Sequence, residues 1–525
     1  MTTEHVSPVD GLQRFLILLC VSIPSFMINL DSNIVAVSLS SIAHSLHADF
    51  ADIEWVISAY TLTFASFVMP AGALADRYGR KRMLLVGLLV FGVASFICGA
   101  ATSVGLLNGA RALQGIGAAI LLSSALATLS HTFRGLHRAR AFAFWGSVIG
   151  IATSLGPVVG GSITQHFGWE WAFYINVPIG AAMIALTLYA VDESKDPHAR
   201  KVDVSGSVTF SSSLFLVTLA LITGNHEGWD SHRVLTEFAC SAALFTLFLL
   251  VESKQQRPML DLSFFRRPTY IGANISGLAF AAGLLTMFTY LPIYFQSGLG
   301  FSPQTAGLMM LPMTVPLFVV PRIVAAHLTH RFSGRGLLTT GLATIGVGLT
   351  WLGIACPQFD YPSMVGGLLI AGIGAGILNG ETAKVSMSVI PPERAGMASG
   401  ISGTVRFSGI VVGFAALGAI LFHTVSQSLE AGLPGGSSAD ALNLTRSIAA
   451  GDLSGGAHAL ASDTDLHQLA LHSFGSGYQA ILFVAAGITL TASVLAWLLV
   501  RSADTAPTPR HVKAPSPGTP QVQKL

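Results

Sequence analysis

Charged residues are scarce in this sequence. Only 10% of its 525 residues are Asp, Glu, Lys or Arg, whereas 52% are hydrophobic. An ordinary soluble protein carries about 25% charged residues. So few charges cannot cover the surfaces of the soluble domains that a chain of this length would form, so the apolar excess must face lipid. The composition therefore excludes a soluble protein.

Several kinds of site are missing as well. The four cysteines lie apart in apolar runs without metal or redox spacing, and the 16 histidines fall in different loops without metal spacing. No phosphate-binding Gly-x-x-x-x-Gly-Lys-Ser/Thr loop occurs, so ATP is not the evident energy source. The near balance of 28 basic and 26 acidic residues argues against nucleic acid as a partner. We therefore expect no cofactor, no metal and no nucleic acid.

Long apolar runs dominate what is present. A spanning helix needs about 20 mainly apolar residues, and fourteen runs predict an all-α polytopic membrane protein with 14 transmembrane helices. Residues 424–475 are a long outer connection rich in Gly, Ser, Ala and Asp, and we expect the Pro/Ser/Thr-rich tail 501–525 to be disordered. The predicted spans are 15–39, 54–74, 83–103, 105–128, 140–164, 171–191, 205–224, 235–252, 269–292, 304–328, 336–355, 363–387, 397–423 and 476–500.

The basic residues predict how these spans are oriented. Loops rich in Lys and Arg stay in the cytoplasm. Placing the N-terminal segment 1–14 inside puts most of the 28 Lys and Arg on the cytoplasmic side and leaves only Arg233 and Arg446 outside. This asymmetry requires an even number of spans. We therefore expect a multi-pass protein of the inner (cytoplasmic) cell membrane with both termini in the cytoplasm.

Two patterns repeat along the chain. The loop Gly72-Ala73-Leu74-Ala75-Asp76-Arg77-Tyr78-Gly79-Arg80-Lys81 has a weaker copy between spans 10 and 11, and the glycines of span 5 are echoed at similar intervals in span 13. These echoes predict two similar six-helix bundles, 15–191 and 269–500, separated by a linker, 192–268, with two inserted helices. Repeated halves are typical of secondary transporters.

The motifs resemble those of a known family. The loop from Gly72 to Lys81 resembles the cytoplasmic loop signature of the major facilitator superfamily, and other stretches resemble its fourteen-helix drug:proton antiporters, the multidrug efflux exporters. One of them departs from the family pattern, because Glu170 stands where a basic residue is usual. The stretches are Leu30-Asp31-x-x-Ile34-Val35, Trp55-Val56-x-x-x-Tyr60-x-Leu62, Arg111-x-x-Gln114-Gly115-x-Gly117, Gly156-Pro157-x-x-Gly160-Gly161 and Trp169-x-Trp171-x-Phe173-x-Ile175-Asn176-x-Pro178-x-Gly180.

Asp31 and Arg111 are the main candidates for proton coupling. Asp31 lies about seven residues before the outer end of its span and Arg111 about six residues after the outer start of its own, so at 1.5 Å per residue their depths match. An ionisable residue in a span costs about 2.5–3.5 kcal/mol on insertion scales, which makes it a functional hypothesis. We expect Asp31 to take up and release the proton and Arg111 to lower its proton affinity in one state. A purely structural ion pair is the alternative.

Glu381 is a second candidate proton site. Lys384, three residues further along the same helical face, can neutralise it. Glu381 also lies about 27 Å down its span, near the cytoplasmic interface. A structural pair is therefore an equally good interpretation.

The remaining candidates are residues that we expect to line a substrate cavity or to take part in conformational change. The resemblance implies a conformational role for the loop residues Gly72, Asp76, Arg77, Gly79, Arg80 and Lys81, and a tight, bent seam that prevents leak for Gly156, Pro157, Gly160 and Gly161 of span 5. Basic-loop topology and plain helix packing are the alternatives. Apolar and aromatic surfaces with scattered polar groups accept varied lipophilic molecules. The predicted cavity residues are Asn33, Tyr60, Gln114, Met287, Tyr290, Tyr294 and Gln296.

These observations favour a proton-coupled antiporter that exports lipophilic drugs or toxic compounds by alternating access and so contributes to antibiotic resistance. Its expected partners are a lipophilic small molecule, protons and the lipid bilayer. We expect a monomer, and a periplasmic adaptor is left open. A dedicated exporter of one endogenous metabolite or antibiotic is the first alternative. A polytopic membrane enzyme is the second, but the clustered Asp, Glu or His expected of one are missing.

Overall fold

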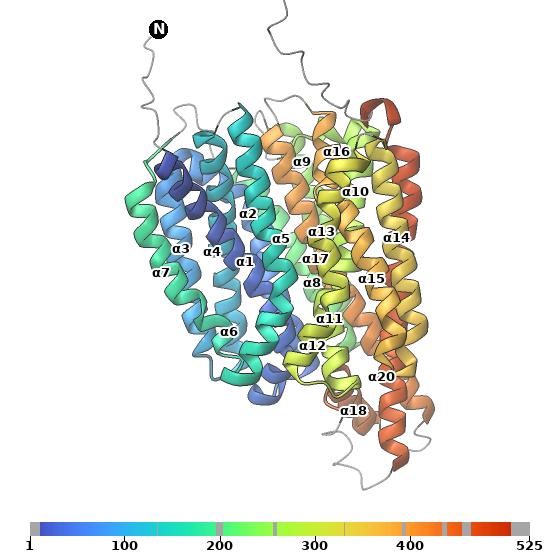
Figure 1. Cartoon of the computed structure of the whole chain (residues 1–525). Coiled ribbons are helices and arrows are strands. Elements are labelled where there is room, and N and C mark those ends of the chain that lie inside the picture. Colours follow the sequence, from blue (N-terminus) through green and yellow to red (C-terminus); the bar gives the residue numbers. More distant parts are fainter. Residues whose placement is uncertain are drawn as a thin grey trace, which may run out of the picture.

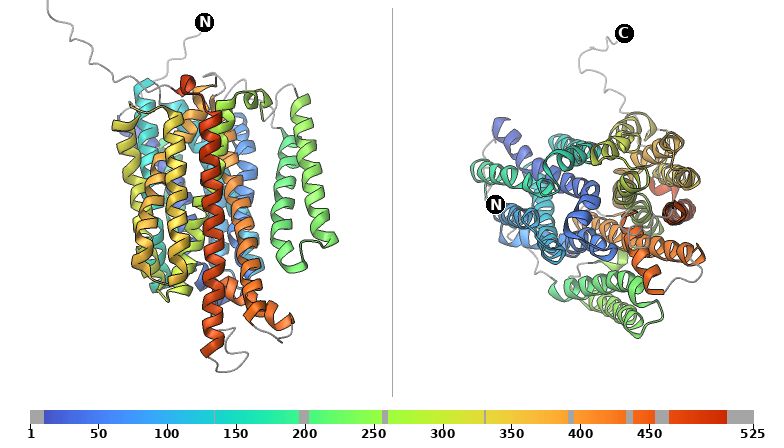
Figure 2. Two further views of the ribbon diagram at one scale, coloured as in Figure 1. Left: turned by 90° about the vertical axis from the view of Figure 1, so that its right-hand side faces the viewer. Right: turned by 90° about the horizontal axis from the view of Figure 1, so that it is seen from below.

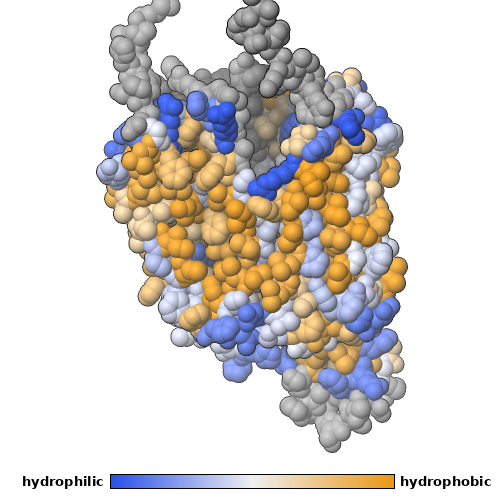
Figure 3. All heavy atoms as spheres, in the orientation of Figure 1, coloured by the Kyte–Doolittle hydropathy of each residue, from blue (hydrophilic) through white to orange (hydrophobic). Residues whose placement is uncertain are grey.

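The computed structural model describes residues 11–133, 135–195, 203–255, 260–329, 331–390, 395–432, 438–453 and 464–505. Within these ranges every regular element is helical. Fourteen helical segments are long and apolar enough to cross a membrane, which confirms the predicted number. Figure 1 shows them standing side by side. On the face shown in Figure 3, hydrophobic residues form a belt across the middle of the molecule, with hydrophilic residues above and below it, as a bilayer requires.

The N-terminal bundle contains six spans, the last of them divided at Ile175. Helices α1, α2, α4 and α5 are longer than the predicted runs, because polar turns extend them beyond the apolar core, whereas α3 has about its predicted length. Its elements are α1 (Gly11–Leu46), α2 (Phe50–Tyr78), α3 (Arg80–Gly99), α4 (Val104–Thr132), α5 (Gly135–Phe167), α6 (Trp171–Tyr174) and α7 (Asn176–Ala190).

The inserted pair consists of α8 (Val204–Glu227) and α9 (His232–Lys254). The two helices stand together at one side of the molecule in both views of Figure 2. Ser213 on α8 and Ser241 on α9 bind each other, since each hydroxyl donates to the other residue's backbone carbonyl at 2.9 and 2.8 Å. The linker between the bundles thus contributes a hairpin of two spans at the edge of the structure.

The C-terminal bundle is less regular. Its first two spans contain π-helical turns, which often mark functional positions in helices. Its elements are η1 (Leu262–Arg266), α10 (Pro268–Phe280), η2 (Ala281–Leu285), α11 (Met287–Ile293), η3 (Tyr294–Gly298), α12 (Pro303–Met309), α13 (Leu311–Ile323), η4 (Val324–Leu328), α14 (Gly334–Ala355), η5 (Cys356–Gln358), α15 (Tyr361–Leu378), α16 (Glu381–Ser388), α17 (Ala395–Gly432), α18 (Ser438–Ala450), α20 (Thr464–Leu499) and η7 (Ser502–Thr505).

The predicted span 363–387 is interrupted. Asn379 ends α15, and Gly380 has φ 90°, a left-handed conformation that glycine adopts without strain. Glu381 then begins the short helix α16. The break places Glu381 in the first turn of a new helix rather than in the middle of an apolar one.

The outer connection 424–475 is largely helical where the structure describes it. Val425 and Leu429 in the extended end of α17, and Leu444 and Ile448 in α18, are buried and join the main hydrophobic core. Each pair is spaced four residues apart, so each forms one apolar helical stripe. The composition of this segment conceals that pattern. Within the tail 501–525, for which we predict disorder, Ser502–Thr505 form the short helix η7, and residues 506–525 lie outside the described residues.

We call the end of the molecule that carries α16 the inner end and the end that carries α18 the outer end (Figure 1). The inner end carries the basic loop after α2 and is the predicted cytoplasmic side.

Glycines allow α3 and α4 to pack closely. A Cβ atom on Gly117 of α4 would lie 2.6 Å from the backbone nitrogen of Phe91, and one on Gly87 of α3 would lie 2.9 Å from that of Leu121. Such distances leave no room for a methyl group. Small residues at helix crossings of this kind replace the hydrophobic effect as the source of packing energy in a bilayer.

We therefore expect Gly117→Ala to destabilise the protein by about 1–3 kcal/mol, because the methyl group must push α3 away from α4. Thermal unfolding of the purified protein in detergent measures this loss. Gly109→Ala on the same helix is the control, because nothing lies within 4 Å of its added Cβ. Equal unfolding temperatures for the two variants would contradict the packing argument.

Candidate functional site

Asp31 and Arg111 form an ion pair inside the N-terminal bundle. Arg111 on α4 donates from Nη1 to Oδ2 of Asp31 on α1 at 2.7 Å, and the two side chains are 1% and 0% exposed. Buried charges persist only when they are paired and hydrogen-bonded. The contact that their matching depths predict is present, and its role in proton coupling remains a prediction.

The other oxygen of Asp31 is also bound. Gln114 Nε2 on α4 and Asn176 Nδ2 on α7 each donate to Oδ1 at 2.9 Å. Both amides also donate to Ser95 Oγ on α3, at 3.2 and 3.0 Å. The cluster therefore joins four helices of the N-terminal bundle around one carboxyl group.

Sequence reasoning finds Gln114 but misses Asn176 and Ser95. Asn176 belongs to the tryptophan-rich stretch after span 5, so its motif offered a signal. Ser95 offered none, since a lone serine in an apolar span usually bonds to its own helix. Here its hydroxyl donates to the backbone carbonyl of Phe173 at 2.9 Å.

Arg111 is held on its other sides too. Its Nε donates to the carbonyl of Val56 on α2 at 3.1 Å, and its guanidinium carbon lies 4.1 Å from the centroid of the Tyr60 ring. A carboxylate ion only accepts hydrogen bonds, and the three side chains that bind Asp31 all donate to it. The cluster thus fits ionised Asp31, and protonation of Asp31 would remove the charge that holds Arg111 in place.

The predicted cavity residues of the N-terminal bundle border this cluster. Tyr60 lies under Arg111 and is 4% exposed, with its ring stacked on that of Phe64. Asn33 is half-buried, and its side chain donates to the carbonyl of Asn29 at 2.7 Å. Both remain predictions as substrate contacts.

The predicted cavity residues of the C-terminal bundle are packed in its core. Met287, Tyr290 and Tyr294 are fully buried. The hydroxyl of Tyr290 donates to the carbonyl of Phe414 at 2.7 Å, and that of Tyr294 donates to the carbonyl of Cys356. In the state shown here, these side chains fill the space between helices and line no open cavity.

Gln296 lies where the two bundles meet. Its Nε2 donates to the carbonyl of Val37 on α1 at 2.8 Å and also to that of Pro292 on its own span. The first bond crosses from the C-terminal to the N-terminal bundle near the outer end of α1.

The glycines of span 5 pack against helices of both bundles. A Cβ on Gly156 would lie 2.5 Å from Asn33 Cβ, and one on Gly160 would lie 2.7 Å from the Cα of Ile34, so α5 packs closely on α1. On its other side, a Cβ on Gly161 would clash with the carbonyl of Pro303 on α12. Gly307 of α12 meets Pro157 in the same way. The outer end is therefore sealed by backbone contacts between the bundles, which we call the outer seam.

The loop after α2 binds the end of α7. Gly79, with φ 115°, separates α2 from α3, and the backbone N–H groups of Lys81 and Arg82 donate to the carboxylate of Glu193, each at 3.2 Å. Anions are favoured at helix N-termini in this way. Lys81 Nζ donates to the carbonyl of Leu188 at 2.9 Å. Sequence reasoning misses Glu193, although it directly follows span 6.

The other members of this loop make fewer contacts. Arg80 donates to Asp76 at 3.0 Å, whereas Arg77 lies over the ring of Tyr78 and is exposed. Gly72, on α2, has open space around its Cα. The contacts fix this loop to its own bundle, and its conformational role remains a prediction.

Glu381 pairs with Lys384 at 3.3 Å, and the two side chains are 9% and 52% exposed. Its second oxygen, Oε2, has no hydrogen-bond partner among the described residues. Glu381 thus lies at the inner end of the C-terminal bundle, whereas the Asp31 cluster lies in the N-terminal bundle.

A carboxyl group that sequence reasoning does not select is Glu54 on α2. It is 0% exposed, and neither of its oxygens has a hydrogen-bond partner in the described part of the chain. It is the first residue of the predicted span 54–74, and nothing in the sequence pattern marks it as buried.

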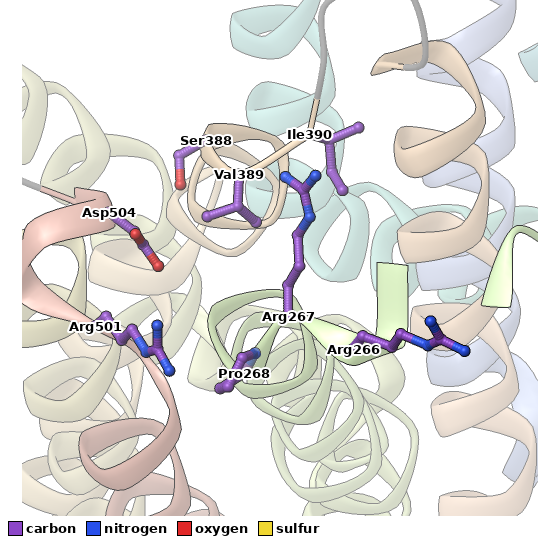
Figure 4. Close-up of a pocket in the computed structure, with 8 residues that line it drawn as sticks. All are labelled: Arg266, Arg267, Pro268, Ser388, Val389, Ile390, Arg501 and Asp504. Carbon is purple, nitrogen blue, oxygen red and sulfur yellow. The ribbon is translucent and has the colours of Figure 1, made fainter. Parts of the chain in front are cut away.

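A pocket of about 590 Å³ opens at the inner end of the C-terminal bundle (Figure 4). Arg266, Arg267 and Arg501 line it, and Asp504, which also lines it, accepts a hydrogen bond from Thr269. None of the predicted site residues belongs to this pocket. The described residues contain no group of three His, Cys, Asp or Glu that could hold a metal ion.

Comparison with protein-family models matches residues 21–414 to the Major Facilitator Superfamily. The chain is 35% identical over 421 residues to the "Multidrug resistance protein Stp" of Mycobacterium tuberculosis, which covers 79% of this chain and 78% of that protein. It is 31% identical to the "Tetracenomycin C resistance and export protein" of Streptomyces glaucescens, over 95% of this chain and 94% of that protein.

Solved structures share the fold. A bacterial homologue of the human lysosomal transporter Spinster, in an inward-facing and occupied conformation, has a TM-score of 0.63 at 14% identity and covers 94% of this chain and 99% of its own. The D-xylose-proton symporter has a TM-score of 0.61 at 13% identity, with coverages of 93% and 98%. These neighbours confirm the predicted architecture.

The burial of the Asp31–Arg111 pair predicts the effect of removing one partner. We expect Arg111→Met to destabilise the protein by about 3–5 kcal/mol, because it leaves an uncompensated carboxylate in the bundle. Thermal unfolding at neutral pH measures the loss. The double variant Asp31→Asn/Arg111→Met should recover part of it.

Arg233→Met is the matched control. Arg233 is 58% exposed and pairs with Glu227 and Glu237, whose side chains are 38% and 10% exposed, so its removal should cost less than the removal of the fully buried Arg111 because solvent reaches this site. A loss at Arg111 no larger than the loss at Arg233 would show that the buried pair does not stabilise the bundle.

Proposed function

Because the chain belongs to the major facilitator superfamily and is a transporter rather than an enzyme, we propose that it exports lipophilic drugs or other toxic compounds in exchange for protons. The relatives named for multidrug resistance and for antibiotic resistance and export support export as the direction of transport. The predicted location is the cytoplasmic membrane with both termini inside.

The observation that carries proton coupling is the carboxyl group of Asp31. It is 0% exposed, it is bound by one cationic donor and two amide donors, and it lies in a span where ionisable residues are functional by default. Asp31 is therefore suited to alternate between an ionised form held by Arg111 and a protonated form that releases Arg111.

The proposed cycle follows from this alternation. Substrate enters from the inner side while Asp31 is ionised and the outer seam is closed. The outer end then opens, the substrate leaves, and Asp31 takes up a proton from outside. Arg111, no longer held by a charge, turns toward its other partners at Val56 and Tyr60. Closure of the outer seam delivers the proton to the inner side, where Asp31 releases it.

Export of one dedicated compound is the second candidate. The relative from Streptomyces glaucescens, named for a single antibiotic, matches 95% of this chain, so this candidate has direct support. A panel of compounds supplied to cells that lack their own exporters distinguishes the two. Resistance to one structural class favours the dedicated exporter, and resistance to several classes favours the multidrug exporter.

Purified protein in proteoliposomes with an imposed pH gradient tests proton coupling. We expect the wild type to move a lipophilic monocation or neutral drug against the proton flow and to collapse the gradient. We expect Asp31→Asn to lose at least about tenfold in coupled transport, because an amide cannot take up the proton, while substrate binding stays measurable. Asp230→Asn, at an exposed outer position, should behave as the wild type.

The two parts of the proposal fail separately. A wild type that moves no compound from the panel would contradict export. Normal coupling in Asp31→Asn would contradict the role of Asp31 while leaving export intact.

A further inference from the structure

Glu54 is a buried carboxyl group outside the Asp31 cluster. It lies near the outer start of α2, and its side chain is 0% exposed. Neither carboxyl oxygen has a hydrogen-bond partner among the described residues, and none of the ion pairs formed by those residues includes it. Asp31, in contrast, has a donor on each oxygen.

Glu54 lies at the boundary between the two bundles. A Cβ atom on Gly418 of α17 would clash with Oε1 of Glu54, and the same atom would lie 2.9 Å from the hydroxyl oxygen of Tyr290 on α11. The carboxyl group of the N-terminal bundle therefore packs against a glycine and a tyrosine hydroxyl of the C-terminal bundle. The meeting of the two bundles therefore contributes to its burial.

The neighbouring hydroxyl cannot stabilise a carboxylate ion. Tyr290 already donates its hydrogen to the carbonyl of Phe414 at 2.7 Å, so its oxygen is left to accept. An ionised carboxylate needs donors, whereas a protonated carboxyl group offers one hydrogen itself. The surroundings of Glu54 thus suit the neutral acid, because a charge buried without donors is strongly disfavoured.

Charged groups on the surrounding helices do not compensate Glu54. Arg111 on α4 is bound to Asp31, and Glu227 on α8 is bound to Arg233. His423 on α17 is exposed, and Arg446 on α18 forms no ion pair with Glu54. Tyr478 on α20 packs edge-on against Tyr290 with ring centroids 6.4 Å apart.

Two acidic residues precede Glu54 on its own element. Asp49 and Asp52 form the capping box of α2, in which each carboxylate accepts a backbone N–H. Their negative charges make ionisation of Glu54 less favourable still.

We propose that Glu54 is a second proton-binding site of the transporter, occupied when the outer seam is closed and exposed to the outer solution when the bundles separate there. This inference rests on the alternating access of the proposed function. The proton of Glu54 comes from the outer solution and returns to it, so it is not transported. It links external pH to closure of the outer end: protons from outside favour the closed seam, and their loss favours the open one.

The linkage has a definite sign and size. The closed state binds the proton of Glu54 more tightly than the open state, so raising the pH favours opening. One linked proton changes the ratio of open to closed molecules by up to about tenfold per pH unit. A structural acid that stays protonated in both states would contribute nothing to this slope.

Distances across the outer seam measure this ratio. Nitroxide labels are attached at Thr102→Cys and Gln427→Cys, two exposed outer positions on the two bundles. The reference protein is full-length, has its exposed Cys240 replaced by Ser, and is studied in nanodiscs. We expect the long-distance population of this reference protein to grow between about pH 5 and about pH 8. Glu54→Gln and Glu54→Met carry no ionisable group at this position. In both variants the change of the open-to-closed ratio with pH, up to about tenfold per pH unit, should therefore be lost, and the seam should stay closed.

Two further variants complete the test. Glu430→Gln removes an exposed carboxylate from the outer part of α17 and should follow the reference curve. Gly418→Ala places a methyl group where the Glu54 carboxyl lies and should keep the seam open at every pH. Reference-like pH curves for both Glu54 variants would overturn the proposal, as would opening of the seam in both.

Transport is measured separately on the same preparations. A reference protein that moves no compound would contradict the proposed export but would leave the distance curves and their dependence on Glu54 unchanged. Failure of the Glu54 inference therefore appears in the distances alone, and failure of the proposed function appears in the transport assay.

Discussion

The ion pair between Asp31 and Arg111 is the interaction on which the N-terminal bundle depends. Both side chains are withdrawn from water, at 0% and 1% exposure, so neither charge is tolerable without the other. Four helices supply the groups that satisfy the pair, and each of those helices is thereby fixed to the rest. In the proposed cycle, ionised Asp31 holds Arg111 in place and protonation of Asp31 releases it. The packing of the bundle and the proposed proton coupling therefore depend on the same buried pair.

The outer part of α2 connects this pair to the boundary between the bundles. The carbonyl of Val56 accepts a hydrogen bond from Arg111, and Glu54, two residues earlier, packs against Gly418 and Tyr290. A displacement of Arg111 therefore acts on the part of α2 that packs against the C-terminal bundle. Close contacts between glycine and backbone, such as those of the outer seam, are lost when the two helices separate by a small distance. This part of α2 thus links two buried carboxyl groups: Asp31, which pairs with Arg111, and Glu54, which pairs with no cation among the described residues.

Sequence reasoning succeeded where depth and motif decided the answer. The rise per residue of a helix brought Asp31 and Arg111 to one level, and the apolar runs, whose even number agrees with the basic loops, predicted the correct number of spans. It could not identify Asn176 and Ser95 as partners, since only packing shows which face of a span meets a neighbour. For the same reason the cavity predicted at Tyr290 and Tyr294 is a packed core in this state. Glu54 was missed because only the packing of α2 against Gly418 of α17 and Tyr290 of α11 buries it.

The account requires that substrate and proton binding oppose each other, because substrate binds while Asp31 is ionised and held by Arg111, and a proton on Asp31 removes that state. The most direct test is a measurement of proton release when a transported compound binds to the purified wild-type protein in weakly buffered detergent solution, followed with a pH-sensitive dye. At a pH where part of the protein carries its coupling proton, binding should release protons, and the amount released should fall to zero as the pH rises and Asp31 becomes fully ionised. Saturable binding without proton release across the whole pH range would contradict the account.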